Sequence, residues 1–137
     1  MPKYKFIEDL TSDVMFEAYG KSLEELFANA AEALFSVICK IRKVGAKKPK
    51  GIEVKAENID KLMIAWLQEL ISIVDIDGMF FSKFEVIEIG ERHLRARVWG
   101  EPAKPGLGGT VVKAVTYYKY KFEKTKEGYR VRVALDI

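Results

Sequence analysis

Residues 93–101, HLRARVWGE, decide the fold class. Apolar side chains alternate here with larger, mostly charged ones, which is the pattern of a strand with one buried and one exposed face. The residues expected on the buried face are Leu94, Ala96 and Val98, and those expected on the other face are Arg95, Arg97 and Trp99. A sheet that is buried on one face needs helices to cover that face, so the pattern predicts an α+β fold.

Two segments earlier in the chain predict the helices. Residues 21–41 begin with Ser22 as N-cap and Glu25 three residues later, a capping box, and their apolar residues recur at helical spacing. Residues 58–75 begin with Asn58 as N-cap, and Gly78 lies past their end. The aromatic and methionine residues of this second segment fall at core spacing, so we expect them to pack and not to bind a cofactor.

Strand patterns occupy most of the remaining chain. They cover residues 3–6, 14–20, 51–57, 79–90, 111–125 and 129–137, with glycine-containing hairpin turns at 89–93 and 125–129. Residues 101–109, EPAKPGLGG, predict a loop. We therefore expect one domain over residues 1–137, α+β, with a mostly antiparallel sheet and two helices packed on one face.

Composition excludes several classes of protein. Hydrophobic residues make up 49% and charged residues 31% of the chain, which allows both a core and a solvated surface. No apolar run reaches the roughly 18 residues of a membrane span, and no signal pattern opens the chain. The single cysteine, Cys39, excludes an internal disulfide and follows an apolar helix end, so we expect a core residue in a cytoplasmic protein without membrane attachment.

Charge is distributed unevenly along the chain. Residues 91–137 hold 11 Lys and Arg against 5 Asp and Glu, whereas residues 1–90 hold 12 against 15. A basic C-terminal half is suited to contact with RNA or with an acidic protein face. Lysines that protect an ordinary strand-rich surface from aggregation predict the same composition, so both interpretations stay open.

Conventional catalytic motifs do not occur in the sequence. The only histidine, His93, lies in a predicted hairpin and has no serine or cysteine nearby to activate. The GLGG stretch at 106–109 follows no strand-to-helix context, so a flexible loop is a better interpretation than a phosphate cradle.

In residues 115–122, VTYYKYKF, alternation places Tyr118, Tyr120 and Phe122 towards the helices, and Tyr117 beside lysines on the other face. That exposed face fits either a soluble sheet surface or stacking of a base.

Carboxylates supply the remaining candidate site. Asp13 opens the strand 14–20, and Asp136 is the penultimate residue of the last strand. If these strands are neighbours, Asp13, Asp136 and the terminal carboxylate of Ile137 converge. Oxygen ligands without nitrogen or sulfur suit a hard cation such as Ca²⁺ or Mg²⁺. End-of-strand aspartates also cap turns, so spacing alone leaves both interpretations open.

The sequence resembles the archease family over nearly its whole length. The resemblance lies in residues 10–35, residues 62–86, the Gly100–Glu101 pair, residues 112–120 and the closing VRVALDI at 131–137. It implies an α+β sandwich and a role as activator of the RtcB-type, GTP-dependent tRNA-splicing RNA ligase. In that role the protein promotes guanylylation of the ligase and its multiple turnover, broadens its nucleotide use, and carries out no bond chemistry itself. The resemblance also implies that Asp13 and Asp136 hold the family's metal, Ca²⁺ or Mg²⁺, with a main-chain or terminal oxygen of Ile137.

Several positions depart from the family pattern. Leu10 and Tyr118 replace residues that are usually histidine, and PAKPGLGGT at 102–110 replaces an acidic segment. Any function of the family that depends on those histidines or on the acidic segment is therefore in doubt for this chain, whereas Asp13 and Asp136 are both retained.

Two other classes of function remain as alternatives. One is an RNA-binding or protein-remodelling, chaperone-like module that uses Lys119, Lys121, Arg130 and Arg132; the other is a small metal-dependent hydrolase, which lacks a histidine base.

Overall fold

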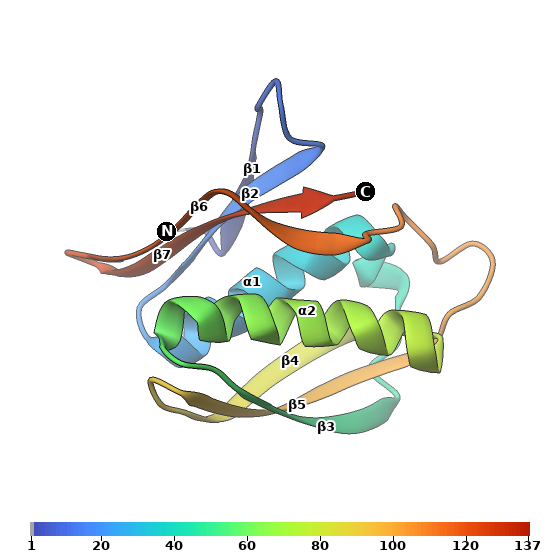
Figure 1. Cartoon of the computed structure of the whole chain (residues 1–137). Helices are drawn as coiled ribbons and strands as arrows, with labels where there is room; N and C mark the ends of the chain where they lie inside the picture. Colours follow the sequence, from blue (N-terminus) through green and yellow to red (C-terminus); the bar gives the residue numbers. More distant parts are fainter. Residues whose placement is uncertain (1) are drawn as a thin grey trace.

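The computed structural model describes residues 2–137, which form seven strands, two α-helices and one short 3₁₀ turn. Figure 1 shows their arrangement. The elements in chain order are β1 (Tyr4–Ile7), β2 (Val14–Gly20), α1 (Leu23–Ile38), η1 (Ile41–Lys43), β3 (Lys48–Lys55), α2 (Ile59–Asp77), β4 (Met79–Ile89), β5 (His93–Pro102), β6 (Ala114–Thr125) and β7 (Gly128–Asp136).

The strands form two separate antiparallel sheets. The four-stranded sheet has the order β1-β2-β7-β6, and the three-stranded sheet has the order β3-β5-β4. Both helices lie in a layer between the two sheets, so each sheet has one face on the helices (Figure 1). The α+β class with a mostly antiparallel sheet and helices on one face is confirmed. The division into two sheets was not predicted, because alternation along a strand shows which face is buried and not which strands pair.

Aromatic contacts join the helix layer to each sheet. Phe27 of α1 packs against Phe122 of β6, with ring centroids 6.3 Å apart. Phe35, two turns later, packs against Phe81 of β4 at 5.7 Å. Trp66 of α2 is fully buried, and its Nε1–H donates to the carbonyl oxygen of Phe27 at 2.9 Å. The prediction that Trp66 is a packing residue is confirmed.

Helix α1 is buried on more sides than its sequence pattern predicted. The predicted buried stripe consists of Leu23, Leu26, Phe27, Ala30, Ala31, Leu34, Phe35 and Ile38. Asn29 and Ala33, which fall outside that stripe, are also buried, because sheets cover the helix from two directions. The side-chain nitrogen of Asn29 donates to the carbonyl oxygen of Tyr19 at 2.7 Å, which satisfies this buried polar group. A helix that is apolar on most sides is typical of a buried middle layer.

The predicted helix caps are largely confirmed. Ser22 Oγ accepts the N–H of Glu25 at 3.1 Å, and Asn58 Oδ1 accepts the N–H of Lys61 at 2.9 Å. Helix α2 continues to Asp77, two residues beyond the predicted segment, and ends at Gly78 with φ of 63°. Strand β3 begins at Lys48, before the predicted start, and includes Pro49. Strand β3 lies at the edge of its sheet. An edge strand tolerates proline, which lacks a backbone N–H, because not every N–H of such a strand needs a partner in the sheet.

The predicted GLGG loop is a loop, and backbone contacts tie it to the end of α1. Gly109 N–H donates to the carbonyl oxygen of Ile38, and Thr110 N–H to that of Val37, each at 2.8 Å. A Cβ on Gly109 would lie 2.5 Å from the Val37 carbonyl oxygen, so this close approach requires glycine. The glycine-rich sequence therefore serves packing of the loop on α1.

Candidate metal centre and the loop that carries it

The pairing of β2 with β7 brings the predicted site residues together. Val14 lies opposite Leu135, so Asp13, just before β2, faces the end of β7. The backbone N–H of Ile137 donates to Asp13 Oδ2 at 3.2 Å. The carbonyl oxygen of Asp136 accepts the N–H of Lys113 at 2.7 Å, so the end of β7 is also held by the residue just before β6. The condition on which the metal hypothesis depended, neighbouring strands, is met.

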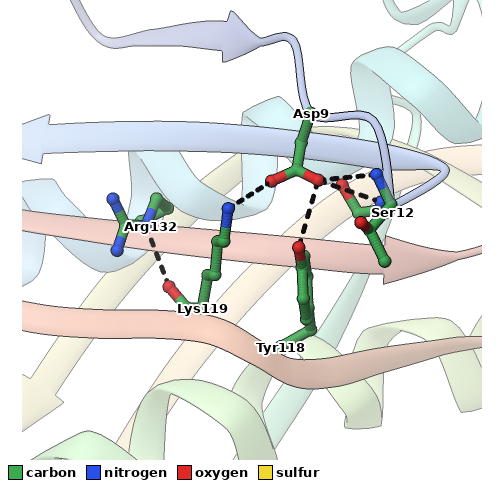
Figure 2. Close-up of polar contacts among 6 residues, drawn as sticks. Asp9, Ser12, Tyr118, Lys119 and Arg132 are labelled. Atoms are coloured by element: carbon green, nitrogen blue, oxygen red, sulfur yellow. Dashed lines mark hydrogen bonds and ion pairs between the residues drawn. The ribbon is translucent and has the colours of Figure 1, made fainter.

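A single carboxylate organises the loop that connects β1 to β2. Asp9 Oδ1 accepts the backbone N–H groups of Thr11 at 2.8 Å and Ser12 at 3.2 Å. Its other contacts cross the sheet: Tyr118 Oη donates to Oδ1 at 3.3 Å, and Lys119 Nζ lies 3.0 Å from Oδ2 (Figure 2). The Asp9 side chain is only 8% exposed. The carboxylate thus fixes the three residues that lead to Asp13.

The environment of Asp9 stabilises its charged form. The hydrogen bond from the Thr11 N–H is the largest cause, followed by the bond from Lys119, and they lower the pKa of Asp9 from 3.8 to about 2 despite partial desolvation. The carboxylate therefore stays ionised, and the loop stays anchored, at all but very acidic pH. The sequence pattern did not single out Asp9, although an aspartate two residues before a threonine is a typical start of an Asx turn.

Two apolar residues are buried on the outer face of the four-stranded sheet. Met15 and Ala134 lie opposite each other in the β2–β7 register and are 3% and 1% exposed. They do not belong to the main core, which the inward-facing residues Phe16, Val133 and Leu135 join instead. Because alternate residues of a strand face opposite sides, the outer face of this sheet is partly buried.

Strand β6 departs from regular pairing beside this loop. Its register against β7 shifts between Thr116 and Lys121, and Lys119 has φ of 51°, an uncommon value for a residue with a side chain. As a result, the neighbours Tyr118 and Lys119 both contact Asp9, and the carbonyl oxygen of Lys119 accepts Arg132 Nε–H at 2.9 Å (Figure 2).

The irregularity corrects one prediction from the alternation pattern. Tyr120 and Phe122 face the helices as predicted: Tyr120 Oη donates to the carbonyl oxygen of Asp60 at 2.7 Å, and Phe122 packs on Phe27. The placement of Tyr118 with them in the core was wrong, since its hydroxyl reaches Asp9 instead. An irregular stretch breaks the period-two rule, which holds only for continuous pairing.

The residues at this end of the sheet fit a hard cation chemically. A hollow of about 270 Å³ lies between Ser12, Asp13, Thr116, Tyr118 and Asp136. The Ser12 hydroxyl oxygen is buried and has no hydrogen-bond partner within residues 2–137. Residues 2–137 contain no group of three or more His, Cys, Asp or Glu side chains placed to hold a metal. Two carboxylates and further oxygens from the hydroxyl, the main chain or water are the donor set that Ca²⁺ or Mg²⁺ accepts.

The two departures from the resembled family differ in position. Leu10 lies at the tip of the loop and is fully exposed. Tyr118 lines the hollow and holds Asp9 through its hydroxyl. A tyrosine therefore has a definite role in anchoring the loop at a position where the resemblance leads one to expect histidine.

Other candidate residues are structural. Cys39 is 2% exposed, as predicted for a core residue, and burial raises the pKa of its thiol to about 12. His93 lies between two carboxylates, with Glu53 at 3.4 Å and Glu88 at 3.5 Å. Glu101 is buried, accepts the N–H of Gly45 and pairs with Lys47 and Lys104, so this carboxylate ties the start of the 101–109 loop to the segment before β3.

The basic residues proposed for RNA contact are largely paired within the chain. Lys119 pairs with Asp9, Lys121 lies 3.3 Å from Glu123, and Arg130 also pairs with Glu123. This pairing favours the interpretation of an ordinary sheet surface, since paired cations offer less charge to a phosphate backbone. Within the described chain, no helix has the combination of length and apolar character that crossing a membrane requires.

Comparisons with known proteins agree with this architecture. The model of the Archease protein family matches residues 4–137. Protein archease of Methanosarcina mazei is 37% identical over 98% of this chain and 96% of its own length. Protein archease of Pyrococcus abyssi is 41% identical over 86% of this chain and 87% of its own length.

Two solved structures share the fold. The solution structure of Methanobacterium thermoautotrophicum protein 1598 has a TM-score of 0.80 and 34% identity, with all of both chains covered. The crystal structure of an archease from Thermotoga maritima, described as a possible chaperone, has a TM-score of 0.69 over 96% of this chain and 95% of its own. Its identity of 20% supports the fold alone.

Proposed function

The chain belongs to the archease family, and from this premise we propose that it activates an RtcB-type, GTP-dependent tRNA-splicing RNA ligase in the cytoplasm. In this role it promotes guanylylation of the ligase, allows multiple turnover in tRNA exon ligation, and broadens the ligase's use of nucleotides. It carries out no bond chemistry itself. The family membership supports the choice of partner class, and one observation supports the proposed acting surface: Asp13 faces the end of β7 on a loop that Asp9 holds in place.

The metal proposal rests on the donor set at this surface. Asp13, Asp136 and an oxygen of Ile137 would hold Ca²⁺ or Mg²⁺, with the unpartnered Ser12 hydroxyl beside them. A cation held by these residues would supply positive charge that offsets the repulsion between the two carboxylates. The chain's own residues then present an ordered, exposed surface to the partner, because Asp9, Tyr118 and Lys119 restrict the loop before docking.

Activation requires a preference between states of the ligase. A protein that binds two conformations equally shifts neither of them, whatever its affinity. We propose that the surface around Asp13 binds the ligase conformation that accepts GTP and metal more tightly than the other. The exposed Leu10 at the loop tip provides an apolar contact next to these carboxylates.

Cation binding has a test that does not depend on the ligase. Isothermal titration of the purified chain with Ca²⁺, and separately with Mg²⁺, should show one site that weakens by about tenfold or more in Asp13→Asn. Asp75→Asn, which changes an exposed carboxylate at the end of α2, is the matched control. Equal binding by the wild-type chain and the Asp13 variant would exclude Asp13 as a ligand.

The activator role itself is tested by turnover. The ligase from the same organism, with RNA, GTP and metal in excess, should form more than one ligation product per ligase molecule only when this chain is added. If turnover is the same without the chain, the activator proposal fails. The RNA-binding alternative instead predicts tRNA binding with a steep salt dependence, which is lost when Lys119, Lys121, Arg130 and Arg132 are replaced.

A further inference from the structure

A second surface of the molecule lacks an assigned role. An open hollow of about 730 Å³ lies between β1, the start of β2 and the C-terminal end of α1 with η1. Its apolar side chains are Tyr4, Phe6, Val14, Val37 and Ile41. We propose that this β1–α1 groove binds an extended, acidic peptide segment of a partner protein. The proposal rests on the groove's own residues and is independent of the role in RNA ligation.

The floor of the groove exposes apolar surface. Phe6 is 49% exposed, although it contacts Tyr4 and Phe16 edge-to-face with ring centroids 5.9 and 6.3 Å away. Val37 and Ile41 beside it are only partly buried. Contiguous apolar surface of this kind costs free energy in water and is typical of a docking site.

The backbone next to the groove offers hydrogen bonds to an extended chain. Strand β1 is the outermost strand of its sheet, and within residues 2–137 no strand pairs with its free edge. An added peptide strand can use such an edge, with main-chain hydrogen bonds for affinity and alternate side chains for specificity. One set of alternate side chains would face the groove, and the other set would face solvent and the rim.

The rim of the groove is positively charged and unpaired. Lys40, Arg42 and Lys43 follow α1 directly and are all exposed. Among residues 2–137 none of the three has a carboxylate within 4.0 Å, whereas Lys119, Lys121 and Arg130 on β6 and β7 each pair with one. Clustered cations of like charge repel one another, so an acidic partner is the complement that they favour.

The shape of the floor favours a peptide over single-stranded RNA. Base stacking needs aromatic faces that are open to the ligand. Here the rings of Tyr4 and Phe6 are nearly perpendicular, at 82°, so they do not present parallel faces on which successive bases could stack. Val14, Val37 and Ile41 add aliphatic surface, which suits valine, leucine or isoleucine side chains of a peptide. The groove begins at Val14, the residue after Asp13, so a bound partner would also lie next to the candidate metal centre.

Fluorescence anisotropy tests the proposal with defined probes. The first probe is a labelled synthetic peptide of about eight residues, the length of a short strand, that alternates glutamate and leucine. The second is a labelled single-stranded RNA of similar length. The wild-type chain should bind the peptide, and the triple variant Lys40→Glu, Arg42→Glu, Lys43→Glu should bind it at least about tenfold more weakly.

A matched variant separates the groove from overall charge. The triple variant Lys55→Glu, Lys124→Glu, Lys126→Glu carries the same change in net charge on exposed residues outside the lining of the groove and should bind the peptide as the wild type does. Phe6→Ser removes exposed apolar surface and should also weaken binding, while circular dichroism confirms that each variant is folded. Absence of peptide binding, an equal loss in the Lys55 triple variant, or displacement of the peptide by the RNA would each overturn the proposal.

Discussion

Asp9 anchors the loop that leads to Asp13 in the candidate metal centre. It accepts two backbone N–H groups of its own loop and receives Tyr118 and Lys119 from β6, so it joins a loop to the far strand of the sheet. Charge-assisted hydrogen bonds of this kind fix geometry as well as adding stability. We infer that the position of Asp13 depends on Asp9.

The lowered pKa of Asp9 predicts a pH dependence of stability. Since its folded-state pKa is about 2 against an ordinary value of 3.8, its contribution is fully present above about pH 4 and is lost as the pH falls through about 2. Urea unfolding between about pH 4 and pH 2 should therefore lose less stability in Asp9→Asn than in the wild type. Parallel pH profiles for the two proteins would show that the Asp9 carboxylate does not stabilise the fold.

Cys39 predicts a chemical reactivity. Its thiol is buried and its pKa is raised to about 12, so almost no thiolate forms at pH 8 in the native protein. Iodoacetamide should modify the chain only after denaturant unfolds it, as measured by intact mass. Rapid modification under native conditions would mean that the end of α1 opens readily.

At the scale of elements, the Gly100–Glu101 pair of β5, which is part of the resemblance to the archease family, stabilises the fold. A Cβ on Gly100 would lie only 1.8 Å from the carbonyl oxygen of Phe80 in β4, so the neighbouring backbone excludes any side chain there. Glu101 ties three segments together through Gly45, Lys47 and Lys104. These two residues therefore hold the three-stranded sheet and its loop, and they lie in a different sheet from the candidate metal centre.

Gly100→Ala should destabilise the protein strongly. Overpacking against a backbone atom costs about 1–3 kcal/mol or more, because the two strands have to move apart. Gly51→Ala in the adjacent strand β3 is the control, since a Cβ there meets no atom of residues 2–137 within 4 Å. Thermal unfolding should show a large fall in Tm for the first variant and little change for the second. Equal melting temperatures would contradict the close approach of β4 and β5.

Elements with local signals were predictable from the sequence, and elements that depend on pairing were not. Ser22 and Asn58 mark their helices because capping bonds are local. Tyr118 was placed wrongly because a shift of strand register leaves no trace in the alternation of residue types. The role of Asp9 was missed for a related reason: its partner Lys119 is 110 residues away along the chain.

At the scale of the whole molecule, the middle layer of helices determines what each sheet can do. Each sheet has one face on α1 and α2, and the outer faces remain for other contacts (Figure 1). On the four-stranded sheet, Met15 and Ala134 are buried on that outer face, and the loop with Asp9 reaches Tyr118 and Lys119 of β6. The aspartates at the ends of β2 and β7 were predicted to converge if these strands were neighbours, and their antiparallel pairing meets that condition. The cation itself remains a prediction.

The most direct test of the central claim is multiple-turnover RNA ligation by the ligase from the same organism, with wild-type chain, Asp13→Asn or Asp75→Asn added. We expect Asp75→Asn to support turnover as the wild type does, and Asp13→Asn to reduce the rate by about tenfold or more while remaining folded. Equal activation by all three proteins would contradict the proposal that the surface around Asp13 acts on the ligase.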